Sequence, residues 1–386
     1  ANVKMPIGLE DFKATVLAQP KIPALPKHAE AAAESLQDAS RRLRLHSIGG
    51  ELQYRALTEQ NLDELETETR DRIEGNAPVR VALPSRSEDT AAVQALVKEY
   101  HDNPTDIRGM HSTPDFYAID YVMGGVEQGE YILIAGRPSM GKSTFIGQYV
   151  CGLAQNGHGG IIFSLEMDRQ SLRRRIACSR AGVNSKLLRQ GKLNSLDQRK
   201  LADELKQMAA YPLWIVDRRG LTIEDIGAIA RKAQREHGIK WIAIDTLNKV
   251  GDITRHGDSM YFGMTVASLG AANLAGSDGN RPRDELLAVF AAVQMSRDNK
   301  ARADKRPTLT DLRDSGALEQ DADKVISIHR DYYYDKEKAD EHAAEVDLLK
   351  NRDGSIGNST LYFEETWPGF RRLARERIDL SVLAAD

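Results

Sequence analysis

Residues 136–144, GRPSMGKST, place the tightest constraint on how this chain can fold. They fit the pattern G-x-x-x-x-G-K-[ST], they follow the apolar run YILIA, and they precede a helical pattern from Lys142 to about Gln155. This strand, loop and helix context distinguishes a phosphate-binding loop from a glycine-rich turn that matches by chance. Glycines let backbone N–H groups approach phosphate oxygens, and the helix N-terminus adds partial positive charge. We therefore predict an α/β fold built around this loop.

Two side chains of the loop have chemical roles with a nucleoside triphosphate. Lys142 can reach the β- and γ-phosphates, and the Ser143 hydroxyl is placed to ligate Mg²⁺. ATP and Mg²⁺ are therefore the expected cofactors. The residues expected to bind them are Gly136, Ser139, Gly141, Lys142, Ser143, Thr144 and Asp245, with Ser143 and Asp245 at the metal.

Length and composition set the broad class of protein. The chain has 386 residues, enough for one large core and a smaller unit. No apolar run approaches the roughly eighteen residues that span a membrane, so we expect no membrane association. Cys151 and Cys178 lack metal-ligand spacing, which fits a reducing compartment and a cytoplasmic protein. A net charge of −4 leaves any nucleic-acid binding to local basic loops.

The first part of the chain is predicted to be separate from the phosphate-binding fold. Residues 1–84 combine a proline-containing arm with two helix-favouring stretches, which predict an arm and a helical hairpin. Residues 85–106 predict a linker helix that starts at a capping box, Ser85-x-x-Glu88. Its apolar stripe packs either on its own domain or on a neighbouring subunit. The stripe consists of Val93, Leu96, Val97 and Tyr100.

Strand and helix patterns alternate over residues 107–386, which predicts a mostly parallel, twisted sheet covered by helices. The closely spaced final strands predict an antiparallel edge. Helix starts are predicted at Ser195-x-x-Gln198 and Thr222-x-x-Asp225, the second helix ending at Gly238. Strands are predicted at 131–136, 160–165, 213–217, 241–247, 287–294, 324–329, 346–350 and 360–363.

Three polar residues at predicted strand ends complete a candidate active site, because ligands of open α/β sheets bind beyond the carboxyl ends of the strands. Asp245 ends an apolar strand and is placed to hold Mg²⁺. Glu166 ends another and can polarise an attacking water, so it is the candidate base. Gln294 is a candidate γ-phosphate sensor, since its amide can donate to a phosphate oxygen. A satisfied polar strand end explains Gln294 nearly as well.

Four segments resemble the motor domain of the DnaB family of hexameric replicative helicases. They are GRPSMGKST, FSLEM at 163–167, DLRDSGALEQDAD at 311–323 and KNRDG at 350–354. The resemblance spans roughly residues 107–373 and implies a RecA-like P-loop NTPase fold in a homohexameric ring. Two departures stand out: residues 1 to about 80 do not match the family's helical collar domain, and Thr246-Leu247-Asn248 replaces its usual aromatic residue and glutamine.

The resemblance also implies how catalytic residues are divided between subunits. Lys142, Glu166 and Gln294 would act on the ATP of their own subunit. Lys350 and Arg352 would reach the ATP of the next subunit, where a cation neutralises charge on the transferred phosphoryl group. Without the resemblance, these last two would be taken as a solvated strand end.

Two loops are candidates for binding single-stranded DNA. Arg313, Asp314 and Gly316 match the central-channel loop of the family. A second loop carries clustered cations that suit sequence-independent phosphate contacts, although a solvated loop gives the same pattern. Its cations are Arg297, Lys300, Arg302, Lys305 and Arg306.

These observations together predict an ATP-dependent replicative helicase that unwinds duplex DNA. The resemblance alone implies 5′ to 3′ movement on single-stranded DNA, and it adds a helicase loader and a primase as partners. Two rivals stay open. One is another RecA-like ATPase, such as a strand-exchange or clock-type ring protein, which segment 311–323 argues against. The other uses ATP to bind DNA or a replication complex without unwinding.

Overall fold

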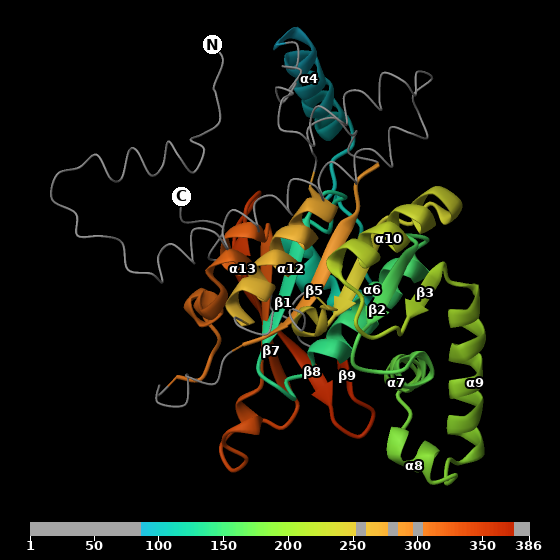
Figure 1. Ribbon diagram of the computed structural model, residues 1–386. Helices are drawn as coiled ribbons and strands as arrows, with labels where there is room; N and C mark the ends of the chain where they lie inside the picture. The colour runs from blue at the N-terminus through green and yellow to red at the C-terminus, as the bar shows by residue number, and fades with distance from the viewer. Residues whose placement is uncertain (1–85, 252–259, 277–284, 296–303, 374–386) are drawn as a thin grey trace, which may run out of the picture. The chain divides into compact units, whose positions relative to one another are not determined.

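The computed structural model describes residues 86–251, 260–276, 285–295 and 304–373 (Figure 1). The chain divides into two compact units, residues 1–102 and 103–386. In the first unit the described part is helix α4 (Arg86–Asp102), which begins one residue after the start and ends four residues before the end of the predicted linker helix 85–106. The predicted arm, hairpin and capping box at 1–85 lie outside the described residues.

The second unit is built on a nine-stranded sheet with the strand order β3-β2-β4-β5-β1-β6-β7-β8-β9. Strands β3 to β6 in this order are all parallel, and β6 to β9 are antiparallel, as the spacing of the final strands predicted. The strands are β1 (Tyr131–Gly136), β2 (Gly160–Ser164), β3 (Leu213–Val216), β4 (Trp241–Asp245), β5 (Ala288–Gln294), β6 (Lys324–His329), β7 (Ala343–Asn351), β8 (Gly357–Glu364) and β9 (Gly369–Arg371).

Helices cover both faces of this sheet, which explains why its central strands are continuous apolar runs. The described helical segments of this unit are η1 (Pro114–Phe116), α5 (Tyr117–Met123), α6 (Lys142–Gln155), α7 (Arg169–Ala181), α8 (Ser185–Arg189), α9 (Ser195–Ala210), α10 (Ile223–His237), η2 (Leu247–Lys249), α12 (Met260–Ala275), η5 (Leu309–Ser315), α13 (Gly316–Asp321) and η6 (Asp331–Tyr333). The core on one face includes side chains from α5, α6, α7 and α9, and the core on the other from α10, α12 and α13. None of the helices within the described ranges has the length and apolar character needed to cross a membrane.

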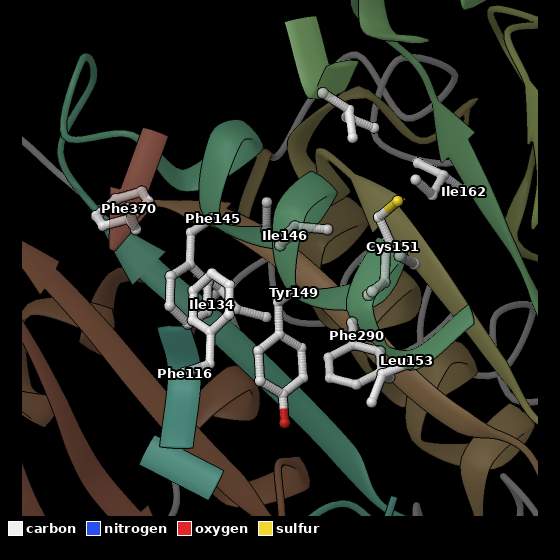
Figure 2. Packing of buried hydrophobic residues seen from close by; sticks show 14 of the residues in the cluster. Phe116, Ile134, Phe145, Ile146, Tyr149, Cys151, Leu153, Ile162, Phe290 and Phe370 are labelled. Carbon is white, nitrogen blue, oxygen red and sulfur yellow. The ribbon is translucent and has the colours of Figure 1, made fainter. Parts of the chain in front are cut away.

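Aromatic packing holds helix α6, which begins at the phosphate-binding loop, against the sheet and the start of the domain (Figure 2). Phe145 stacks on Tyr149 with ring centroids 5.8 Å apart, and Phe116 meets both rings edge to face. Phe370 of β9 packs on Phe145 from the other side. The loop is therefore mounted on a helix with a rigid, close-packed base.

A buried polar cluster lies against the middle of α6, at Tyr149. Asp120 accepts hydrogen bonds from the Tyr149 hydroxyl at 2.5 Å and from the Ser112 N–H at 3.0 Å. Burial raises the pKa of Asp120 to about 7, against the opposing effect of these two hydrogen bonds. The Ser112 hydroxyl donates to the Tyr149 carbonyl at 2.7 Å, so the segment before the sheet is tied to the helix.

Of the two predicted helix starts, the structure confirms the one at Thr222 and contradicts the one at Ser195. Thr222 and Asp225 form the predicted capping box, and Gly238 ends α10 in the left-handed conformation. The capping box at Ser195 is wrong, because Asn194 caps α9 by accepting from the Asp197 N–H.

The predicted strand boundaries are exact for two strands and differ at others. The structure confirms 131–136 and 324–329. The predicted strand 241–247 ends earlier, at Asp245, because the chain turns into η2. Strands β7 and β8 are longer than predicted, and β9 was missed.

Candidate active site

A cavity of about 520 Å³ opens beyond the carboxyl ends of the parallel strands. It brings together eight of the predicted site residues from four separate segments of the chain. These are Ser139, Gly141, Lys142, Ser143, Thr144, Glu166, Asp245 and Gln294. Gly136 ends β1 immediately before the loop, and its carbonyl accepts a hydrogen bond from Lys142.

The loop conformation depends on backbone shapes that most residues avoid. Gly141 has φ 101° and Ser139 has φ 67°, both in the left-handed region. A Cβ atom at Gly141 would also lie 2.9 Å from the Phe370 ring. Glycine at this position is therefore required by both the backbone and the packing beneath it.

Lys142 is held within the loop by its own backbone. Its ammonium donates to the carbonyls of Gly136 at 2.7 Å and Arg137 at 2.9 Å. Burial lowers the pKa of Lys142 to about 8, while the charges of Asp245 and Glu166 oppose this shift. The ammonium thus sits among carbonyls in a partly dry site, where its attraction for a phosphate is stronger than in water.

The Ser143 hydroxyl donates to Asp245 Oδ1 at 2.9 Å, so the two predicted metal-site residues lie against each other. Burial raises the pKa of Asp245 to about 6, and the hydrogen bond from Ser143 opposes this. A hydroxyl and a carboxylate are hard oxygen ligands that suit Mg²⁺. Among the described residues, no group of three or more histidine, cysteine, aspartate or glutamate side chains could hold a metal. The pair fits Mg²⁺, which takes few protein ligands and keeps phosphate and water oxygens.

Glu166 lies shortly after β2 and Gln294 is the last residue of β5, and both are exposed side chains that line the cavity. The Gln294 N–H donates to Asn248 Oδ1 at 2.9 Å, and the Thr246 hydroxyl donates to the Ala292 carbonyl at 2.7 Å. Thr246 and Asn248, in the segment that departs from the family pattern, therefore hold the end of β5 by hydrogen bonds.

Sequence reasoning missed several side chains that line the cavity, among them Arg175, Arg330, Phe363 and Glu365. Arg330 lies over the Phe363 ring at 4.0 Å and pairs with Glu365 at 2.7 Å. Its Nε is buried with no hydrogen-bond partner within the described part of the chain. Arg330 follows β6, and the strand-end rule that identified Asp245 could also have found it.

Lys350 and Arg352 do not reach the cavity of their own chain. Because β7 runs antiparallel to β6, Lys350 pairs with Val325 near the amino end of the parallel strands, opposite the phosphate-binding loop. Its ammonium donates to the carbonyls of Glu319 at 2.6 Å and Ala322 at 2.7 Å. Arg352 pairs with Asp323 at 2.8 Å.

The candidate DNA-binding residues are described only in part. Arg313, Asp314 and Gly316 lie where η5 passes into α13, and their backbone alone is described. Arg297, Lys300 and Arg302 lie outside the described residues. Lys305 and Arg306 lie just within them.

Arg306 has strong contacts with carboxylates of its own chain. It makes a bidentate pair with Glu345, both distances being 2.6 Å, and a further pair with Asp331 at 3.1 Å. Its guanidinium therefore anchors the end of the basic segment to β7.

Comparison with known proteins gives consistent matches over this unit. The DnaB-like helicase C terminal domain matches residues 109–372. The replicative DNA helicase DnaC of Bacillus subtilis is 31% identical over 287 residues, covering 74% of this chain and 61% of that protein. The replicative DNA helicase DnaB of Geobacillus stearothermophilus is 31% identical over 280 residues, covering 72% and 60%. The chain thus spans about three fifths of the length of these relatives.

Two solved structures are similar in fold as well as sequence. One is an ATPase domain with a TM-score of 0.68 and 29% identity, covering 75% of this chain and all of that one. The other is a DnaB-like replicative helicase, solved with its interactions with primase. It has a TM-score of 0.67 and 26% identity, covering 91% and 81%. The mostly parallel sheet of this chain is therefore of the type predicted from its sequence.

Proposed function

Because this chain belongs to the family of DnaB-like helicase C-terminal domains, we propose that it is an ATP-dependent replicative DNA helicase. It would hydrolyse ATP with Mg²⁺, move along single-stranded DNA in the 5′ to 3′ direction of the family, and separate the duplex ahead of it. The observation that carries this proposal is the cavity in which the phosphate-binding loop, Asp245, Glu166 and Gln294 meet.

Each side chain in the cavity has a role that follows from its position. Lys142 would exchange its two carbonyl partners for β- and γ-phosphate oxygens. Ser143 and Asp245 would hold Mg²⁺, which supplies positive charge to bridging phosphate oxygens. Glu166 would orient and polarise the attacking water, and the Gln294 amide would contact the γ-phosphate.

The rim of the cavity suits the nucleobase. Arg330 and Phe363 offer a cation and an aromatic face at the same place, and Glu365 holds the guanidinium there. Because both side chains are almost fully buried, a base would lie against the edge of this pair at the rim rather than between them.

We further propose that the active unit is a ring of six subunits. Lys350 and Arg352 lie at the end of the sheet opposite the phosphate-binding loop, so a head-to-tail contact would bring them to the next subunit's cavity. Arg313, Asp314, Gly316 and the basic segment up to Arg306 would line the central channel and contact phosphates. A loader would place the ring on DNA, and a primase is proposed as a partner because a structural relative was solved with its primase interactions.

The apolar stripe on α4 gives a prediction about ring assembly. Leu96 and Val97 are 39% and 62% exposed, so the stripe has apolar surface left for a neighbouring motor domain. Replacing both with aspartate should leave a folded protein that no longer forms hexamers in sedimentation. Leu196→Asp is the matched control, since this α9 leucine is 61% exposed outside the stripe. An unchanged hexamer in the double variant contradicts the docking role.

The proposed function is tested by two activities of the wild-type chain. Single-stranded DNA should stimulate ATP hydrolysis, and a forked duplex should be separated in an ATP-dependent strand-displacement assay. DNA-stimulated hydrolysis without displacement on any fork would favour the rival interpretation, a protein that uses ATP to bind DNA or a replication complex.

A further inference from the structure

One outer edge of the sheet combines a solvent-exposed aromatic pair with exposed basic side chains. Strand β3 is the first strand in the sheet order and pairs with β2 on one side. Helix α9 precedes β3 and α10 follows it, and Figure 1 shows both helices beside this strand. We name α9, β3 and the C-terminal end of α10 the β3 edge. None of its residues belongs to the ATP cavity.

The aromatic pair arises from the alternation of side chains along β3. Leu213 and Ile215 point into the core with α9, so Trp214 lies on the opposite face of the strand. Its indole stacks on the His237 ring at the end of α10, with centroids 4.8 Å apart and planes 18° apart. Trp214 is nevertheless 37% exposed, whereas Trp241 on β4 is fully buried. One of the largest apolar side chains of the protein is thus partly open to solvent.

The segment before β3 is basic, but its excess of cations lies in residues 168–194, because α9 itself carries three cations and three carboxylates. Residues 168–210, which form α7, α8 and α9, contain eleven lysines and arginines but four aspartates and glutamates, while the chain as a whole has a net charge of −4. This segment is inserted between β2 and β3. Such a local basic field attracts polyanions.

The cations of α9 face outward beside β3. Leu201 and Met208 bury the inner face of α9, so Arg199 and Lys206, seven residues apart, share the exposed face. Neither has an ion-pair partner within the described ranges. Lys200 lies between them in sequence and is 3.8 Å from Asp197, a contact between exposed groups that contributes little.

The nearby carboxylates offset this charge only in part. Glu204 faces inward and pairs with Arg180 at 2.5 Å, and Asp197 accepts from the Asn194 side chain at the start of the helix. Asp203 is exposed on α9. At the end of α10, Glu236 lies 3.8 Å from Lys232. The outward charges of α9 are therefore three cations against Asp197 and Asp203, a net excess of one positive charge at this edge.

We propose that the β3 edge binds single-stranded DNA, with phosphates on Arg199, Lys200 and Lys206 and a base stacked on Trp214. Cations that bind phosphates and an exposed aromatic ring that stacks on a base are the groups that hold single strands without sequence preference. Duplex DNA would contact the cations but not the indole, because its bases are already stacked on one another. The inference rests on the proposed function, since unwinding produces a second strand that runs outside the channel.

Tryptophan fluorescence tests this directly, because Trp214 reports on the edge alone. In a Trp367→Phe background the other tryptophan is the buried Trp241, so quenching by oligothymidylate reports contact at Trp214. We expect quenching that saturates with single strands, and a crosslink between Trp214 and an oligonucleotide carrying 5-iodouracil. Absence of both, or equal quenching by a blunt duplex, overturns the inference.

Substitutions on α9 and at Trp214 measure separately what the cations and the indole contribute to DNA affinity. The first variant combines Arg199→Gln, Lys200→Gln and Lys206→Gln. The slope of its log affinity against log salt concentration should be smaller in magnitude by about 2, because each phosphate that is no longer neutralised removes roughly 0.7 from the slope. Trp214→Ala should abolish the crosslink, because the reacting side chain is gone, and should weaken binding of a fluorescein-labelled single strand to the edge about tenfold in an anisotropy titration. Lys336→Gln with Lys338→Gln is the matched control, since these exposed lysines lie elsewhere and should change neither quantity. Equal effects of the control and the α9 variant contradict the proposal.

A parallel measurement separates this inference from the proposed function. DNA-stimulated ATP hydrolysis reports on the channel loops and should be unchanged in the α9 variant at saturating DNA. If hydrolysis is stimulated by DNA but Trp214 is not quenched, the edge site is wrong and the helicase proposal stands. If Trp214 is quenched but hydrolysis ignores DNA, the proposed function fails and the edge site stands.

Discussion

Replacing Glu166 with glutamine should slow ATP hydrolysis by about 10²- to 10⁴-fold while ATP binding is retained. The substitution keeps the size of the side chain but removes the charge that polarises the attacking water. Glu166 lines the same cavity as Lys142, Ser143 and Asp245, none of which the substitution alters. Single-turnover hydrolysis and equilibrium binding of a labelled ATP analogue measure the two effects separately.

A second glutamate in the same cavity provides the control. Glu365 lines the rim and pairs with Arg330, away from the proposed water position. Glu365→Gln should leave kcat within a few-fold of wild type and act mainly on KM, because it loosens the surface proposed for the base. Near-normal turnover of Glu166→Gln would remove this residue from the role of base.

Replacing Arg352 with alanine should lower kcat by about 10³-fold or more in the assembled ring, since a cation delivered to the transferred phosphoryl group is worth this much in related chemistry. The arginine side chain is 51% exposed and lies at the end of the sheet opposite its own cavity. We expect hexamers to form normally, because the ion pair with Asp323 is exposed in part and contributes little to stability.

Mixing two inactive variants tests whether Arg352 acts on the neighbouring subunit. Lys142→Ala and Arg352→Ala should each be inactive alone, yet in a one-to-one mixture roughly a quarter of the contacts combine an intact loop with an intact arginine. Hydrolysis should therefore reappear on mixing and subunit exchange. No recovery in hexamers shown to be mixed would mean that both residues serve the same subunit.

The parts of the fold that sequence predicted well are those where a local rule decides the structure. Buried parallel strands are continuous apolar runs, so 131–136 and 324–329 were located to the residue. Strand β7 is different, because alternate residues are half exposed and pairing with β6 and β8 extends it beyond the apolar stretch. At α9, Asn194 and Ser195 are both good capping residues, and the sequence does not rank them.

In the active site, too, the residues that follow a local sequence rule were predicted, and those placed by contacts distant in sequence were missed. Lys142, Ser143, Glu166 and Asp245 follow from a motif and from the rule that ligands bind at strand ends. Arg175 was missed because it belongs to a run of three arginines on α7 that looks like a solvated helix face. The stacking of Arg330 on Phe363 joins the residue after β6 to a residue of β8, and no local pattern encodes that contact.

The hydrogen bonds of Lys142 to its own loop have a consequence for the speed of the cycle. With Lys142 on the carbonyls of Gly136 and Arg137, and Ser143 on Asp245, the main polar groups of the cavity already have partners within the chain. Nucleotide entry is then an exchange of partners, so net affinity is smaller than the number of phosphate contacts suggests. After hydrolysis the same internal partners are available to replace the departing product. A site arranged in this way favours rapid emptying and refilling over tight retention.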